Sequence, residues 1–170
     1  MPCAVELGKR KAAKAAEAKA KRERAKTRAQ REALKTIPQL TKEAQRAFNA
    51  WVRLRDQGLP CVSCGSTEAG GSLTGGYWDC GHYRSVGACP ELRFEPLNAH
   101  RQCKRCNQHQ SGNVVEYRLR LIQRIGLAAV EWLEGPHEAR RYSRDELRKI
   151  RDTYRAKARE LRKAKTRRAA

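Results

Sequence analysis

Two pairs of cysteines, each separated by two residues, carry the clearest chemistry in this sequence. The pairs are Cys61-x-x-Cys64 and Cys103-x-x-Cys106. A tight turn within each pair lets two thiolates reach one ion, and four thiolates complete the closed tetrahedral site of a structural Zn2+. We therefore expect one zinc ion to join the two ends of the 38-residue segment between the pairs and to supply folding energy.

The other cysteines are Cys3, Cys80 and Cys89, which lack the paired spacing. A total of seven, with four in C-x-x-C pairs, favours metal over disulfides in a reducing compartment. Cys80 and Cys89 are alternatives for a position in the metal site, but we expect all three to be spare thiols. For the paired cysteines, the alternative is a buried or redox-active set without metal.

Histidine and asparagine residues lie close to the cysteine pairs. Trp78-Asp79-Cys80-Gly81-His82 falls between the pairs, Asn98-Ala99-His100 precedes the second pair, and Asn107 follows it directly.

This pattern resembles a known group of enzymes. A His near the end of a first strand, an Asn five residues before a C-x-x-C pair and an Asn directly after it resemble the HNH, or ββα-metal (His-Me finger), nucleases with a zinc knuckle. The longer strings, residues 93–95, 98–103, 106–113 and 116–118, are similar to the phage NinG (Rap) recombination nuclease family. The likeness covers about residues 40–160 and leaves out the lysine-rich N-terminal arm.

The resemblance implies phosphodiester hydrolysis, which requires a base that activates water and a cation that neutralises charge on the phosphate and the leaving oxygen. A neutral imidazole suits the base near pH 7, and a hard ion such as Mg2+ needs few protein ligands. The resemblance also implies a role for each residue of the pattern. His82 would be the general base, Asn107 a ligand of one catalytic Mg2+ or Mn2+, and Asn98 a structural residue that buttresses the loop and orients the histidine. Many HNH nucleases carry the other metal ligand immediately before the base, where this sequence has Gly81. Asp79 takes that role only if the strand turns, because residues three apart do not share a strand face.

Further candidates surround this pattern. His100 is a second candidate for contact with the phosphate or the metal. Five basic residues are candidate phosphate contacts: Arg84, Arg93, Arg101, Lys104 and Arg105. The family resemblance implies a metal-dependent, structure-selective DNA endonuclease that acts on branched recombination intermediates such as Holliday junctions and D-loops. The alternative is a non-catalytic zinc-knuckle protein that binds DNA or RNA, with structural histidines.

The charge of the chain is strongly positive and unevenly placed. The net charge is +20, of which residues 1–36 carry +8, residues 37–139 carry +2 and residues 140–170 carry +10. Such a balance favours a polyanionic partner, and the ends are suited to holding phosphate backbones without reading bases. No stretch has the length of a membrane span or the pattern of a secretory signal. We therefore expect a soluble protein of the cytoplasm, that of the host cell if a phage encodes it.

The elements predicted around these residues define an α+β fold: a small zinc-stapled ββα-metal (HNH-like) core with flanking helices and basic helical or disordered ends. Residues 1–36 form the arm, 37–139 the nuclease-like domain and 140–170 a basic helix. The arm is read as a nascent helix or disordered segment that orders on phosphates, or as a solubilising tail.

Inside the domain, Thr41 is the predicted cap of a first helix that ends near Gly58. Residues 77–83 and 92–97 are expected to pair as strands. Ser111 is the predicted cap of a later helix, and a shorter helix covers 127–133.

The last helix is predicted to begin at the capping-box sequence Ser143-Arg144-Asp145-Glu146. Its stripe of Leu147, Ile150, Tyr154 and Leu161 fits either an intramolecular packing face or the interface of a homodimer.

Overall fold

The computed structural model describes residues 4–68 and 76–169. The chain divides into two compact units, Met1–Thr36 and Ile37–Ala170, and each is described by itself. Unit 1 contains α1 (Ala4–Ala33). Its alanine, lysine, arginine and glutamate residues favour a helix, and every side chain from 6 to 31 is exposed. The arm is therefore helical but has no apolar core of its own.

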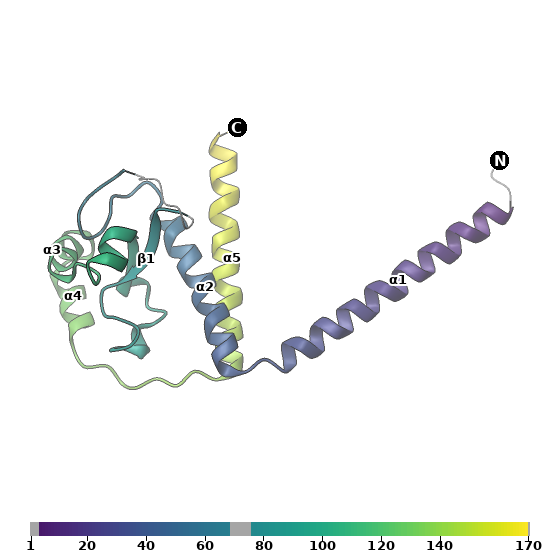
Figure 1. Cartoon of the computed structure of the whole chain (residues 1–170), viewed down its shortest axis with the longest axis horizontal. Helices are drawn as coiled ribbons and strands as arrows, with labels where there is room; N and C mark the ends of the chain where they lie inside the picture. Colours follow the sequence, from purple (N-terminus) through teal and green to yellow (C-terminus); the bar gives the residue numbers. More distant parts are fainter. Residues whose placement is uncertain (1–3, 69–75, 170) are drawn as a thin grey trace. The chain divides into compact units, whose positions relative to one another are not determined.

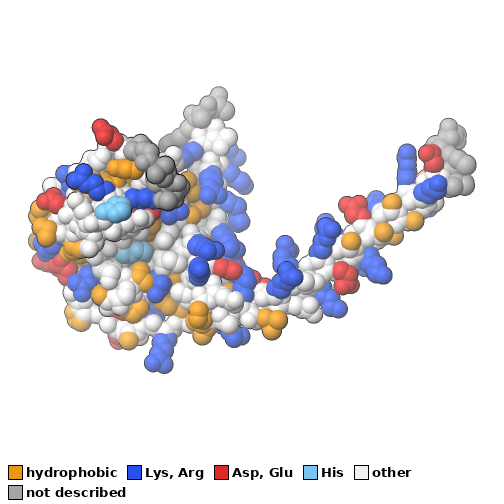
Figure 2. Space-filling model, viewed as in Figure 1, with side chains coloured by type: hydrophobic (Ala, Val, Ile, Leu, Met, Phe, Trp, Pro, Cys, Tyr) orange, Lys and Arg blue, Asp and Glu red, His pale blue; other side chains and the backbone are white. Residues whose placement is uncertain are grey.

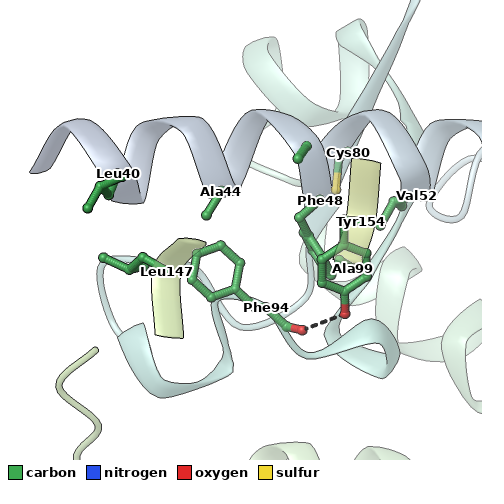
Figure 3. Close-up of a cluster of buried hydrophobic side chains, with 10 residues drawn as sticks. Leu40, Ala44, Phe48, Val52, Cys80, Phe94, Ala99, Leu147 and Tyr154 are labelled. Carbon is green, nitrogen blue, oxygen red and sulfur yellow. Dashed lines mark hydrogen bonds between the residues drawn. The ribbon is translucent and has the colours of Figure 1, made fainter. Parts of the chain in front are cut away.

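Two long helices form one side of unit 2. These are α2 (Ile37–Arg55) and α5 (Arg144–Ala169), which lie side by side in Figure 1. Apolar residues of α2 recur with helical spacing and are buried against the last helix. The cluster between them includes Leu40, Ala44, Phe48 and Val52 of α2 and Leu147 and Tyr154 of α5 (Figure 3).

A two-stranded antiparallel ribbon packs against this pair of helices. Strand β1 is Trp78–His82 and strand β2 is Ala99–Cys103, with Trp78 opposite Cys103 and His82 opposite Ala99. Because side chains alternate along a strand, the ribbon has two faces. One face carries Cys80 and Ala99, which join the α2 cluster, and we call it the α2 face.

The opposite face of the ribbon lies against α3 (Val114–Ile125), and we call it the α3 face. The Tyr117 hydroxyl of α3 donates a hydrogen bond of 3.0 Å to the carbonyl oxygen of Gly81. A second apolar cluster lies on this side, and it includes α4 (Leu127–Glu134) through Val130 and Leu133. The ribbon is therefore enclosed between two groups of helices.

Short helical turns complete the chain around the ribbon. They are η1 (Pro90–Leu92) and η2 (Pro96–Asn98), both 3-10 turns, and η3 (Arg105–His109), a π-helical turn directly after β2. Among the described residues no helix is both long enough and apolar enough to cross a membrane.

The prediction of a second strand at residues 92–97 is wrong. Prolines begin both η1 and η2, and the fixed φ of proline and its missing N–H suit the first turn of a helix better than a strand ladder. The partner of β1 is the next segment, Ala99–Cys103. The first predicted strand, 77–83, is confirmed as β1.

Two predicted helix caps are also wrong. The first helix begins at Ile37, so Thr41 lies inside it, where its hydroxyl donates to the Ile37 carbonyl at 2.9 Å. Ser111 has a φ of 48° and precedes the helix, which begins at Val114 after Asn113.

The capping box of the last helix is confirmed. The backbone N–H of Ser143 donates to Glu146 Oε2 at 2.8 Å, and the N–H of Glu146 donates to Ser143 Oγ at 3.2 Å. The stripe of the last helix packs within the chain, since Leu147 and Tyr154 are buried against α2.

Candidate metal centre and ribbon site

The four paired cysteines come together at one end of the ribbon. The sulfur atoms of Cys61, Cys64, Cys103 and Cys106 all lie within 4.8 Å of one another, and those of Cys64 and Cys103 are 3.8 Å apart. Zinc–sulfur bonds of about 2.3 Å place the sulfurs of a tetrahedral site about 3.8 Å apart. The arrangement fits a four-thiolate metal site such as that of structural zinc.

Backbone geometry prepares this site for thiolates. The N–H of Cys103 donates to Cys61 Sγ at 3.4 Å, and the N–H of Cys106 donates to Cys103 Sγ at 3.5 Å. The Asn113 amide donates to Cys106 Sγ at 3.9 Å. Burial raises the pKa of the Cys61 thiol, but hydrogen bonds from the backbone outweigh it and lower the pKa overall. Donors directed at the Cys61 sulfur favour the charged form that binds metal, whereas burial raises the pKa of the Cys103 and Cys106 thiols above the ordinary value, so an ion would have to displace their protons.

Cys80 and Cys89 do not join this cluster. Cys80 is buried in the α2 cluster, and burial raises the pKa of its thiol to about 12. Cys89 is buried in the second apolar cluster. Cys3 lies outside the described residues.

Asp79 and Asn107 are brought into contact. The Asn107 amide nitrogen donates to Asp79 Oδ2 at 2.9 Å, and the Gln108 amide nitrogen donates to the same oxygen at 2.7 Å. Asn107 and Gln108 belong to η3, so the turn after β2 folds back onto β1. Because Asn107 donates through nitrogen, its oxygen Oδ1 is the atom left to bind a cation.

His82 ends β1 on the α2 face. Its Nε2 lies 3.1 Å from the carbonyl oxygen of Arg93, and its ring lies 6.0 Å from that of Phe48. A carbonyl oxygen only accepts, so Nε2 carries the proton and Nδ1 carries the lone pair. Burial is the main cause that lowers the pKa of His82 below its ordinary value, so the ring is neutral near pH 7.

Asn98 holds the loop that follows His82. Its side-chain oxygen accepts from the N–H of Arg84 at 2.7 Å, and its side-chain nitrogen donates to the carbonyls of Arg84 at 3.0 Å and Leu92 at 3.1 Å. The side chain is fully buried. These bonds tie both ends of the connection between the strands to β2.

His100 lies in the interior on the α3 face, only 4% exposed. Its Nδ1 accepts from Arg55 at 3.2 Å, so its Nε2 is the donor to the Leu97 carbonyl at 3.1 Å. Both ring nitrogens therefore have protein partners, and the structure gives His100 no open side toward a phosphate.

A buried ionic network around Asp56 has no signal in the sequence. The Arg55 guanidinium donates to both oxygens of the Asp56 carboxylate, at 2.6 and 2.8 Å. The backbone N–H of Arg101 donates to it at 3.0 Å, and Arg124 of α3 lies 3.8 Å away. Burial raises the pKa of Asp56, but these partners, Arg55 above all, lower it far below its ordinary value. Adjacent charges at a helix end carry no spacing pattern that would reveal such a network.

The ribbon separates the residues of the expected catalytic pattern. His82 lies on the α2 face, whereas Asp79 lies on the α3 face, as strand alternation requires. Three residues of strand also put their Cα atoms about 10 Å apart. Asn107 therefore joins Asp79 and not His82.

The five basic residues predicted as phosphate contacts differ in their exposure and in their protein contacts. Arg101 stacks on Trp78 at 3.6 Å and donates to the Leu59 carbonyl at 3.0 Å. Arg93 donates to Gln45 Oε1 at 3.3 Å. Arg105 is exposed, and Arg84 and Lys104 are half-buried.

These features define a small, helix-dominated mixed protein with a two-stranded ribbon and, at one end of the ribbon, a four-cysteine cluster with the geometry of a metal site. The chain belongs to the NinG family, since the family described as Bacteriophage Lambda NinG protein matches residues 3–165. It is 46% identical over 134 residues to Protein ninG of Salmonella phage P22 and to Protein ninG of Escherichia phage lambda. Each alignment covers 79% of this chain and 63% of the relative, so the chain spans less than two thirds of their length. No solved structure matches it.

Proposed function

We propose that this protein is a divalent-metal-dependent DNA endonuclease that cleaves branched recombination intermediates. The observation that carries the proposal is His82, a neutral imidazole whose Nε2 is bound to the Arg93 carbonyl, so that Nδ1 is the proton acceptor. A base of this kind activates water near pH 7.

Asp79 and Asn107 supply the oxygen atoms that a hard cation prefers. Their contact of 2.9 Å brings a carboxylate and an amide together on the α3 face. A Mg2+ or Mn2+ ion bound there would neutralise charge on a phosphate. Asn98 supports the base by fixing the loop that begins after it.

The separation of His82 from Asp79 favours a second candidate. If the base and the ion ligands stay on opposite faces of the ribbon, the protein is a non-catalytic zinc-knuckle protein that binds nucleic acid. Its net charge of +20 suits that role equally well.

Cleavage of a labelled four-way junction in Mg2+, beside a linear duplex of the same sequence, separates the two candidates. The nuclease cuts the junction, and His82→Ala keeps zinc, fold and junction affinity but loses cleavage by about a hundredfold or more, as is typical of general acid-base catalysis. Asn107→Ala also cuts poorly, and high Mg2+ or Mn2+ partly restores it because its defect is metal occupancy.

An active His82→Ala variant would overturn the assignment of the base. A wild-type protein that binds the junction and never cuts it would establish the binding protein instead. Loss of zinc from His82→Ala would place this residue in the structural site.

A further inference from the structure

A basic groove runs along α2 and reaches Arg93, whose backbone contacts His82. Apart from Arg93, none of the residues that line it is a candidate site residue named above. The groove has a volume of about 570 Å3. Its lining comes from one stripe of α2 and from Arg93: Ile37, Pro38, Thr41, Lys42, Gln45, Arg46, Asn49 and Arg93. Three of these residues are cationic and none is acidic. The groove thus combines a largely apolar lining with three cations, which suits the sugars and phosphates of a nucleic acid strand.

The cations of the groove are not neutralised by carboxylates. Within the described part of the chain, neither Lys42 nor Arg46 has an ion pair, and both are exposed. Among the described residues, the Arg93 guanidinium donates to the neutral side chain of Gln45, at 3.3 Å, and to no carboxylate. Gln45 is held in turn by Asn49, to which its amide nitrogen donates at 2.7 Å. This pair of amides orients a guanidinium and leaves its charge uncompensated.

Arg93 connects the groove to the candidate base. Its guanidinium reaches Gln45 in the groove, while its backbone carbonyl accepts the Nε2 proton of His82. A phosphate bound by the Arg93 guanidinium would therefore be separated from His82 by about the length of the Arg93 side chain.

We propose that this groove holds one strand of DNA, with its phosphates on Lys42, Arg46 and Arg93 and its sugars on Ile37 and Pro38. Lys42 and Arg46 are four residues apart, so they are about 6 Å apart along the helix axis, comparable with successive phosphates on a strand. The contacts on offer are those of one backbone, because Lys42 and Arg46 lie in one line along α2 and match successive phosphates of the same strand. The inference rests on the proposed function in assuming DNA as the partner.

The test is the salt dependence of binding to a fluorescent single-stranded oligonucleotide. Lys42→Ala/Arg46→Ala should weaken binding and reduce the slope of log K against log salt by about 1.4, which is two phosphates at about 0.7 each. The matched control is Arg141→Ala/Arg144→Ala, which removes two exposed charges outside the groove and should leave more of the slope intact. Crosslinking with a 4-thiothymidine strand should label peptides from residues 37–49 or the peptide that contains Arg93.

Three outcomes would overturn the proposal that this groove binds DNA. They are an unchanged slope in the Lys42→Ala/Arg46→Ala variant, an equal loss in the control, or crosslinks only elsewhere. An equal loss of duplex and single-strand binding would overturn the choice of a single strand. The proposed function has a separate readout, since a variant that still cuts junctions as the wild type does would refute the groove alone. A wild-type protein that binds no nucleic acid at all would refute both.

Discussion

Gln102 restricts the type of residue that position 81 of the ribbon can hold. Its amide nitrogen donates to Ser63 Oγ at 2.6 Å and to the Gly112 carbonyl at 2.5 Å. Its oxygen Oε1 is buried without a hydrogen-bond partner in the described residues. A Cβ atom added at Gly81 would lie 2.0 Å from this oxygen. Gln102 therefore fills the space of a side chain at position 81, where the resemblance to HNH nucleases would place an Asp or a His.

Gly81→Ala should lower the free energy of unfolding by about 1–3 kcal/mol, the usual cost of overpacking a buried site. Gln102 would have to move, and its two hydrogen bonds would weaken. Urea denaturation at pH 7 measures the change. Gly87→Ala is the matched control, because a Cβ there meets nothing within 4 Å. Equal stability of the two variants would show that Gln102 yields at no cost.

Several functional residues could be read from the sequence, and others could not. The paired spacing of the four cysteines identified the metal cluster because such spacing has few other uses. The position of Asn98 before the second pair pointed to a loop buttress, and its hydrogen bonds fit that role. The burial of His100 had no local signal, since its partners Arg55 and Arg124 come from helices distant in the chain.

At the scale of elements, the Asp56 network joins the end of α2, strand β2 and α3. Asp56→Asn should destabilise unit 2 by about 3–5 kcal/mol at pH 7, because the variant leaves half-buried arginines without the buried carboxylate that neutralises them. Urea denaturation measures this loss. Asp145→Asn is the control: its side chain is 92% exposed and pairs with Arg148 at 2.8 Å, so its loss should cost about 0–1 kcal/mol.

The pH dependence of Asp56 has a defined sign. Its pKa in the folded state lies far below the ordinary value of 3.8, so its contribution to stability is complete above about pH 4. Protonation of the unfolded state removes that contribution as the pH falls below 4 toward the folded-state value. The stability difference between wild type and Asp56→Asn should therefore be constant from pH 5 to 7 and shrink below pH 4. A difference that grows in acid would contradict the assignment.

Elements were predictable where one local rule dominated. The capping box fixed the start of α5, and a short segment with aromatic residues, set off by a loop with Gly and Pro, located β1. The second strand was misplaced because aromatic and apolar residues at 92–97 look like a strand, whereas Pro90 and Pro96 impose helical turns. The stripe of α5 was visible, but a stripe does not name its partner, which is α2.

For the whole molecule, the four-cysteine cluster is expected to decide whether unit 2 folds. It joins two segments that are 38 residues apart, and a structural zinc site contributes its binding energy to folding. Elemental analysis should find one zinc per chain, and removal of zinc by a chelator should abolish the cooperative melting transition. Cys103→Ser should do the same, whereas Cys89→Ala should retain one zinc. A zinc-free protein with an unchanged transition would refute this expectation.

The arm should be separable from the folded unit. Unit 1 carries +8 of net charge, and its side chains from 6 to 31 are exposed. Figure 2 shows its Lys and Arg side chains spaced along α1. Deletion of residues 1–36 should leave the melting temperature unchanged, but should weaken binding to every DNA form and flatten the salt dependence. An unchanged affinity and slope would identify the arm as a solubilising tail.

The position of Cys103 makes metal binding a check on strand pairing. Cys103 stands opposite Trp78 in the ribbon, and its sulfur belongs to the metal cluster. A slip of β2 by one residue would turn each of its side chains to the other face, and Cys103 would then point away from the remaining sulfurs. Chains paired in a wrong register would offer an ion three thiolates and would hold it less tightly. Zinc bound at the cluster would therefore favour correctly paired chains, and in a zinc-starved cell the protein would lose this selection between correct and slipped molecules together with its stability.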